Sequence, residues 1–168
     1  MQAKARLFGH PIHQMLIVFP LGVLATSFFF DIAYLVNKRV DVATVAFWMI
    51  FAGVIGGLVA AVFGLIDWLG IPSRTRAKKI GVLHGVGNVI VVGLFIGSWL
   101  LRRPDPTIPS ITAIVLSAFA VGLALITGWL GGELVDRLSV GVDEGAHVDA
   151  PSSLSGRAAS ESSKERAA

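Results

Sequence analysis

The sequence predicts an all-α integral membrane protein, a four-helix transmembrane bundle in which sequential helices are antiparallel neighbours. Of its 168 residues, 54% are hydrophobic and 15% are charged, and its mean hydropathy is +0.75. These values lie outside the range of soluble domains. Four long apolar segments joined by short links make up most of the chain. Lipid is therefore the expected surroundings of this protein.

Each apolar segment is long enough to cross the membrane, because about 20 residues of helix span about 30 Å of hydrocarbon. The predicted spans cover residues 11–36, 42–69, 80–101 and 108–130. Lys4 and Arg6 precede the first span, as basic residues do in a signal peptide. However, the apolar stretch is long and no small-residue cleavage site follows it cleanly, so we expect a retained helix.

The links between the spans are short, at residues 37–39, 70–74 and 102–106, and contain Gly, Pro and charged residues. Short links make sequential helices antiparallel neighbours. We therefore expect one four-span domain over residues 1–142. Residues 143–168 are rich in Ser, Ala and charge, which predicts a disordered cytoplasmic tail in which His147 is solvated.

Basic residues in the short flanks indicate the orientation. Seven of them lie on the side of the N-terminus and four on the other: Lys4, Arg6, Arg74, Arg76, Lys78, Lys79 and Arg137 against Lys38, Arg39, Arg102 and Arg103. The positive-inside rule then places both termini on the cytoplasmic side of the membrane. The net charge of +3 arises from these flanks, which argues against nucleic acid as a partner.

Glycines recur at four-residue spacing, which is typical of close helix contacts in membranes. The pairs are Gly53 and Gly57, Gly81 and Gly85, Gly93 and Gly97, and Gly128 and Gly132. The same spacing serves contacts inside one bundle and contacts in a homodimer, so both remain open.

A weak internal repeat is also present. The second span ends Asp67-Trp68-Leu69-Gly70 and the fourth ends Gly128-Trp129-Leu130-Gly131. The first helix of each pair has a histidine near its start, His13 and His84. This pattern indicates a duplicated helical hairpin with a pseudo-twofold axis along the membrane normal, although Trp and Gly also favour helix ends at membrane surfaces for other reasons.

Five ionisable residues are expected near one membrane face: His10, His13, Asp67, His84 and Glu133. If the helix extends back through Pro11, the rings of His10 and His13 project from the same side. His84 and Asn88 also share a helix face, and both are costly to expose to lipid, so they should face the bundle interior.

Imidazole and carboxylate groups bind divalent transition metals, and two axial imidazoles are enough for haem b. A metal ion would use two or three of the histidines with Asp67 or Glu133, whereas a haem would lie between His13 and His84. A carboxylate is equally suited to fix an imidazole tautomer. A structural polar cluster, with Asp67 paired to Arg74 or Lys79, and a proton or ion pathway are the other interpretations.

Asp31 lies near the opposite face, where it is expected to pair with Lys38, Arg102 or Arg103 in a structural role. The chain contains no cysteine, which excludes disulfides, thiolate metal sites and a cysteine nucleophile. No zinc-protease, phosphate-loop, nucleotide-binding or nucleophile-elbow motif is present. The sequence therefore gives no support for an enzyme.

The stretch Gly9-His10-Pro11-Ile12-His13-Gln14-Met15-Leu16, followed by Phe19-Pro20 and Phe30-Asp31, resembles the bacterial membrane protein family catalogued as domain of unknown function 2231. Three later stretches, 64–68, 81–85 and 131–135, are similar to that family as well. The resemblance covers residues 7–142 and implies no settled activity. Gln14 stands where the family implies a second proline. Some relatives are joined to Rieske-type domains, which implies a redox setting.

Two hypotheses follow for the function. In the first, a haem or metal site near the cytoplasmic face exchanges electrons with a redox protein partner. In the second, the protein is a membrane scaffold or accessory subunit without metal, in which the histidines stabilise the structure and the glycine faces bind a partner. In both hypotheses the lipid bilayer surrounds the protein and is its first partner.

Overall fold

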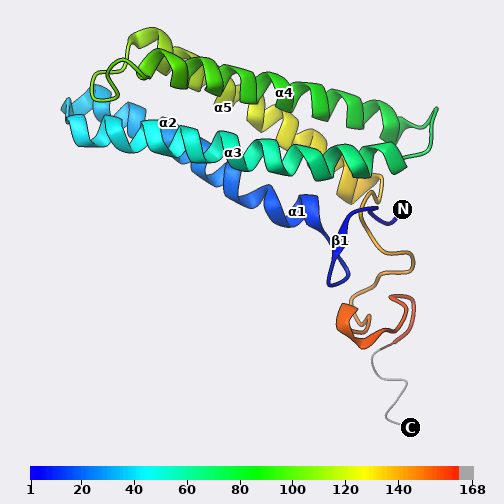
Figure 1. Ribbon diagram of the computed structural model, residues 1–168. Coiled ribbons are helices and arrows are strands. Elements are labelled where there is room, and N and C mark those ends of the chain that lie inside the picture. The colour runs from blue at the N-terminus through cyan, green and yellow to red at the C-terminus, as the bar shows by residue number, and fades with distance from the viewer. Residues whose placement is uncertain (163–168) are drawn as a thin grey trace.

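The computed structural model describes residues 1–162 as a long helical bundle (Figure 1). A small N-terminal hairpin pairs β1 (Arg6–Leu7) with β2 (His10–Pro11). The helices are α1 (Ile12–Leu16), α2 (Val18–Asn37), α3 (Val40–Gly70), α4 (Arg76–Arg102) and α5 (Ile111–Gly132). A π-helical turn, η1 (Glu133–Arg137), continues α5, and a 3-10 turn, η2 (Ser153–Ser155), lies in the tail.

The predicted fold class is confirmed. Within residues 1–162, four helical stretches are long and apolar enough to cross a membrane, with α1 and α2 forming the first and α5 with η1 forming the last. Many of their large apolar side chains point outward, for example Val89 and Phe119, as expected for a surface that faces lipid rather than water. The membrane-spanning part is therefore one bundle.

The four spans pack in a ring. α2 packs mainly on α3, and α4 packs mainly on α5, while smaller contacts join α3 to α4 and α2 to α5. The first helices of the two hairpins, α1–α2 and α4, therefore lie diagonally across the bundle. This arrangement matters because both polar networks described below join these diagonal partners.

Short polar side chains begin two of the helices. Thr75 accepts a hydrogen bond from the Lys78 N–H at the start of α4, and Ser110 accepts one from the Ala113 N–H at the start of α5. Such caps satisfy N–H groups that the first helical turn leaves unpaired. Because Thr75 is the cap, α4 starts four residues before the predicted span at residue 80.

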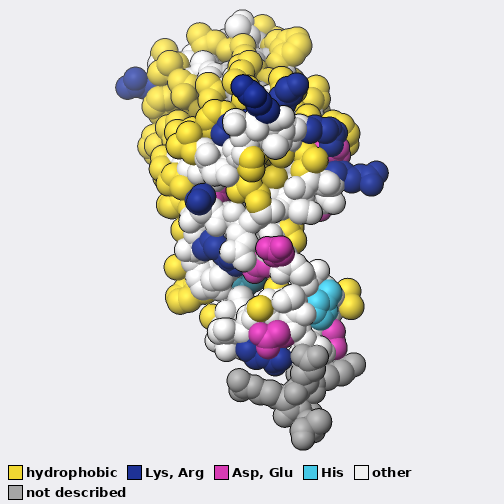
Figure 2. Space-filling view, turned by 90° about the vertical axis from the view of Figure 1, so that its right-hand side faces the viewer, with side chains coloured by type: hydrophobic (Ala, Val, Ile, Leu, Met, Phe, Trp, Pro, Cys, Tyr) yellow, Lys and Arg dark blue, Asp and Glu magenta, His cyan; other side chains and the backbone are white. Residues whose placement is uncertain are grey.

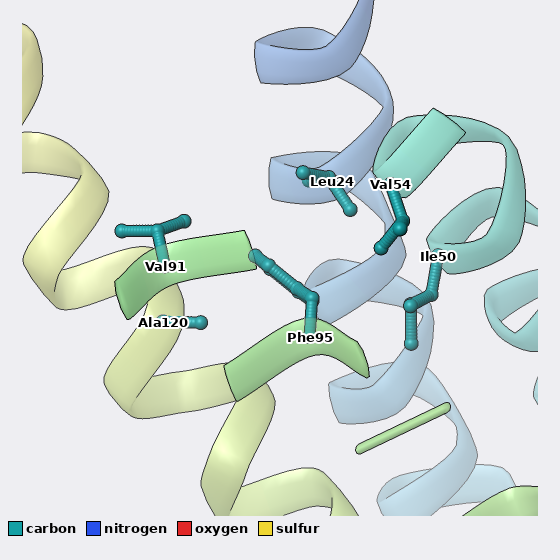
Figure 3. Packing of buried hydrophobic residues seen from close by; sticks show 6 residues of the cluster. All are labelled: Leu24, Ile50, Val54, Val91, Phe95 and Ala120. Carbon is teal, nitrogen blue, oxygen red and sulfur yellow. The ribbon is translucent and has the colours of Figure 1, made fainter. Parts of the chain in front are cut away.

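An apolar core fills the middle of the bundle and separates its two ends. Figure 3 shows the six buried residues Leu24, Ile50, Val54, Val91, Phe95 and Ala120, which come from all four spans. Phe95 and Ile50 are fully buried. The polar networks lie on either side of this core.

The network at the end opposite the N-terminus is centred on the ion pair of Asp31 and Arg102, both of which are fully buried. The guanidinium donates to both carboxylate oxygens of Asp31, at 2.6 and 2.8 Å. It also donates to the hydroxyls of Ser98 and Ser117, each at 3.2 Å. The pairing of Asp31 predicted from the sequence is confirmed, with Arg102 as the partner.

The glycine pairs divide into inward and outward positions. A methyl group added to Gly53 would lie 2.5 Å from the Leu24 side chain, and one added to Gly81 would lie 2.7 Å from the Trp68 ring. Gly85, Gly93 and Gly128 have no neighbour within 4 Å of such a methyl group. Four-residue spacing therefore marks contacts inside the bundle at the first two positions, whereas the last three positions face outward.

The described part of the tail, residues 143–162, consists of turns and η2. It contacts the N-terminal hairpin through Ser153, whose hydroxyl donates to the Phe8 carbonyl, and Arg157 pairs with Glu161. Lys164 and Arg166 lie outside the described residues. The division into a four-span domain and a disordered tail stays a prediction.

Candidate functional site

Two histidines lie at the end of the bundle that holds the N-terminus, and each is fixed by a backbone carbonyl of the neighbouring helix. His13 on α1 has its Nδ1 2.8 Å from the Ala60 carbonyl oxygen on α3. His84 on α4 has its Nδ1 2.8 Å from the Thr127 carbonyl oxygen on α5. A carbonyl can only accept, so Nδ1 carries the proton in each neutral ring. Nε2 is then the nitrogen with a free lone pair in both rings.

Each ring also packs against a glycine four residues after the carbonyl that holds it. A methyl group on Gly64 would lie 2.8 Å from the His13 ring, and one on Gly131 would lie 3.1 Å from the His84 ring. The same arrangement of histidine, carbonyl and glycine therefore occurs in both hairpins. It supports the predicted duplication in three dimensions.

The structure changes the register of that duplication. Trp68 follows Gly64 by four residues, whereas Trp129 precedes Gly131 by two. If Gly64 and Gly131 are equivalent, the two tryptophans are not. The Trp-Leu-Gly match in the sequence therefore aligns residues that occupy different turns, and the histidines define the repeat.

The two imidazole rings lie next to each other across the diagonal of the bundle. Their centroids are 6.4 Å apart, and their planes are nearly perpendicular, at 89°. Both rings are half-buried. His84 lies eight residues after the start of α4, about 12 Å along the helix at about 1.5 Å per residue. The predicted span, which began at residue 80, placed it only four residues from the helix start.

Asn88 fixes the His84 side of the pair. Its Nδ2 donates to the His84 carbonyl oxygen at 2.9 Å and lies 3.4 and 3.3 Å from the two nitrogens of the His84 ring. An atom equally far from both nitrogens lies over the ring face, so it leaves the in-plane lone pair of Nε2 free. The Thr127 hydroxyl donates to Asn88 Oδ1 at 3.1 Å. The predicted inward direction of Asn88 is thus explained by its partners.

Asp67 holds the N-terminal segment, residues 1–11, against the end of α3. One carboxylate oxygen accepts hydrogen bonds from the N–H groups of Lys4 and Ala5, at 2.7 and 3.0 Å. The terminal amine of Met1 donates to the Ser139 carbonyl at 2.7 Å. Asp67 is almost fully buried. Its role in the structure is that of a cap for two otherwise unpaired N–H groups, and neither Arg74 nor Lys79 is its partner.

Glu133 and His10 also have other partners. The Glu133 carboxylate pairs with Arg76 at the start of α4. His10 is in β2 and exposed, with its Nε2 3.3 Å from the Ser153 hydroxyl. The helix does not extend back through Pro11, because Pro11 caps α1 in an extended conformation. His10 and His13 therefore do not project from one helix face as predicted.

The five-residue cluster predicted from the sequence is not formed. Among residues 1–162, no three His, Asp or Glu side chains lie close enough together to hold a metal ion. What the structure brings together is the pair of His13 and His84. The sequence did not point to the carbonyls of Ala60 and Thr127, because any residue supplies a carbonyl. The glycines four residues later were the available signal.

Two shallow apolar hollows lie away from the histidine pair, on surfaces that face lipid. One is lined mainly by α3 residues together with Phe19 and Val23 of α2. The other is lined only by α5 residues, between Ala118 and Ile126. Neither contains an ionisable side chain, so neither adds a chemical group to the site.

Four apolar helices around an inward-facing pair of histidines define a small polytopic membrane protein. The chain belongs to a family described as predicted membrane protein (DUF2231), which matches residues 9–144. This match confirms the resemblance seen in the sequence. No curated protein and no solved structure matches the chain.

Proposed function

We propose that this protein is a membrane redox component in which His13 and His84 bind one iron atom as haem b. The observation that carries the proposal is the spacing of the two rings. A metal-bound nitrogen lies about 2 Å from the metal and about 1 Å from its own ring centre, so imidazoles on opposite sides of one metal have centroids about 6 Å apart. The observed separation is 6.4 Å.

The number of ligands favours haem over a bare metal ion. Structural zinc takes four protein ligands and catalytic zinc three, and non-haem iron sites commonly use three. Two imidazoles at a tetrahedral angle would also have closer centroids, about 5 Å. Haem needs only axial ligands from the protein. The pair therefore fits haem better than it fits the divalent transition metals that the sequence also allowed.

The hydrogen bonds of the two rings are those expected of ligating histidines. Such histidines almost always donate their second ring N–H to a carbonyl, a carboxylate or water, which fixes the tautomer. The Ala60 and Thr127 carbonyls supply this acceptor to His13 and His84 respectively. A bound haem would supply one-electron exchange, and a redox protein partner would dock on this end of the bundle.

The experiment is an optical spectrum and an iron determination on the detergent-purified full chain, from cells grown with ample iron. We expect near-stoichiometric haem in the wild type, loss of haem in His13→Ala and in His84→Ala, and retention in His10→Ala. His10 is a matched control because it is exposed and its Nε2 contacts the Ser153 hydroxyl rather than either paired histidine. Unfolding temperatures of all four proteins check that loss of haem does not reflect misfolding.

The rival function is a metal-free scaffold or accessory subunit. It is favoured by the structural partners of Asp67, Glu133 and His10, because each of these groups contacts a residue other than the two paired histidines. No haem in the purified wild type, together with none taken up from added haemin, would reject the redox proposal and leave the scaffold.

We also infer that both termini are cytoplasmic. The flanks on the N-terminal side contain more Lys and Arg than the opposite flanks, which supports this orientation. The chain has no cysteine, so single cysteines at Ser139 and at Lys38 are clean reporters. A membrane-impermeant maleimide added to intact cells should label the variant at Lys38 and not the variant at Ser139.

A homodimer is the remaining proposal for partners. Gly85 and Gly93 on α4 are exposed and have open space beside them, which would allow the backbone of a second copy to approach closely. Cysteine at Gly93 should then form a disulfide-linked dimer in membranes, whereas cysteine at the inward Gly53 should not.

A further inference from the structure

The end of the bundle at the link between α3 and α4 presents cations without partners. Figure 2 looks onto this end, where basic side chains lie beside apolar ones. Arg74 in the link and Lys79 in the first turns of α4 are exposed. Within residues 1–162, neither side chain has an ion pair or a hydrogen bond to another residue. The two basic residues between them in the sequence, Arg76 and Lys78, do have such partners.

Those other two cations are used by the protein itself. Arg76 pairs with Glu133. The Lys78 ammonium lies 3.7 Å from the centre of the Trp68 ring and donates to the Trp68 carbonyl oxygen at 2.7 Å. The Lys78 contacts join α4 to α3, and the Arg76 pair joins α4 to η1. Arg74 and Lys79 remain as the two cations of this end whose side chains have no such partner among the described residues.

The first turn of α4 adds to the attraction for an anion. It contains no acidic residue, although acidic side chains are favoured where the helix dipole is positive. Thr75 accepts from the Lys78 N–H, whereas the N–H groups of Arg76 and Ala77 have no acceptor among the described residues. Two free cations and two free N–H groups thus share one end of the helix.

Lys79 also heads an apolar stripe that faces lipid. Val82, Leu83 and Val86 follow it at three-, four- and seven-residue spacing, so they lie on the same helix face. Their exposed fractions are 42%, 58% and 55%. A molecule that contacts both the cations and this stripe must have an anionic head and an apolar tail. A soluble anion would contact only the two cations and not the apolar stripe.

We propose that Arg74 and Lys79 bind the phosphate of an acidic phospholipid whose acyl chain lies along Val82, Leu83 and Val86. Charge complementarity selects the headgroup, since a basic residue close to an anionic membrane surface attracts it. The stripe places the bound lipid in the annulus around α4. This proposal does not depend on haem binding.

The test measures lipid binding to the detergent-purified full chain by native mass spectrometry, with phosphatidylglycerol and phosphatidylcholine as probes. We expect phosphatidylglycerol to bind more tightly than phosphatidylcholine. The double variant Arg74→Gln, Lys79→Gln should weaken phosphatidylglycerol binding roughly 30-fold, because each cation near an anionic surface contributes about fivefold. Unchanged unfolding temperature in phosphatidylcholine shows that the variant is folded.

The matched control is Lys38→Gln, Arg103→Gln, which removes the same charge from exposed cations at the opposite end. It should leave the tight phosphatidylglycerol site intact, and an equal loss in both double variants would overturn the proposal in favour of general charge attraction. Glycerol phosphate, which has no acyl chain, should compete poorly. Full competition by glycerol phosphate would show a free phosphate site instead and would overturn the lipid assignment.

Discussion

Removing one member of the buried ion pair should destabilise the bundle strongly. Asp31 and Arg102 are both fully buried, and Asp31 lies six residues before the end of α2, about 9 Å along the helix at about 1.5 Å per residue. Asp31→Leu leaves the guanidinium without a counter-charge in the interior. We expect a loss of about 3–5 kcal/mol in the free energy of unfolding, the range measured when a buried pair is broken.

The double variant Asp31→Leu, Arg102→Met should recover most of that loss. Two apolar side chains of similar volume remove both charges together, and such replacements are often neutral. The two serines keep their bonds in the double variant, because the Ser98 hydroxyl donates to the Ala113 carbonyl oxygen at 2.7 Å and lies 2.9 Å from the Ser117 hydroxyl. No polar group is then stranded in the interior.

The assay is equilibrium unfolding in mixed detergent and dodecyl sulfate micelles, followed by circular dichroism. Each single variant, the double variant and the wild type form a double-mutant cycle, which isolates the coupling between the two side chains. We expect strong non-additivity. Single losses below about 1 kcal/mol, or a double loss equal to the sum of the two single losses, would show that water or lipid headgroups already satisfy these charges and would refute the reasoning.

Two other predictions follow from the packing and the N-terminal contacts. Gly53→Ala should destabilise the protein by about 1–3 kcal/mol, since its methyl group would overlap the Leu24 side chain. Gly122→Ala should be neutral or slightly stabilising, because nothing lies within 4 Å of a methyl group there; the same unfolding assay compares them. Asp67→Ala should release the N-terminal segment by removing the acceptor of two N–H groups. Hydrogen exchange at residues 4–5 should then become much faster while exchange in the middle of α5 stays unchanged, and unchanged protection at residues 4–5 would contradict the role of Asp67.

The helices were predictable because one physical requirement determines them. Every backbone group inside the membrane must be hydrogen-bonded within the segment, so a long apolar run has to be a helix. Their ends were less predictable, because they depend on polar caps. The start of α4 at Arg76, ahead of Lys78 and Lys79, follows from the Thr75 cap and not from hydropathy.

The candidate site was only partly predictable, for a related reason. Sequence distance along a helix gives depth, so it grouped five ionisable residues near one membrane face: His10, His13, Asp67, His84 and Glu133. It does not give the direction of each side chain around the bundle, nor the competing partners. Asp67 turns to the N-terminal segment and Glu133 to Arg76, and both contacts join segments that are distant in the sequence. A pair of His13 and His84 was expected from the sequence as haem ligands, and the structure adds the diagonal arrangement of α1 and α4 that brings the two rings together.

The positions of the two polar networks bear on the proton or ion pathway that the sequence left open. Along α4, His84 and Asn88 belong to one network and Ser98 and Arg102 to the other. Between them lie Val91 and fully buried Phe95, which pack against apolar residues of all the other spans. Moving an ion across this region would require burial of a charge without partners, at a prohibitive cost.

The arrangement of the described residues therefore separates the ends of the bundle chemically. One end contains the buried ion pair of Asp31 and Arg102, whose guanidinium also donates to the hydroxyls of Ser98 and Ser117. The other contains two imidazoles, His13 and His84, each with its Nδ1 held by a backbone carbonyl. An apolar core opposes the passage of a proton or an ion but not that of an electron, so this separation favours a redox centre over a transport path. For this reason, we expect the free Nε2 atoms of His13 and His84 to bind a metal rather than to transfer protons, and metal binding is the function to test first.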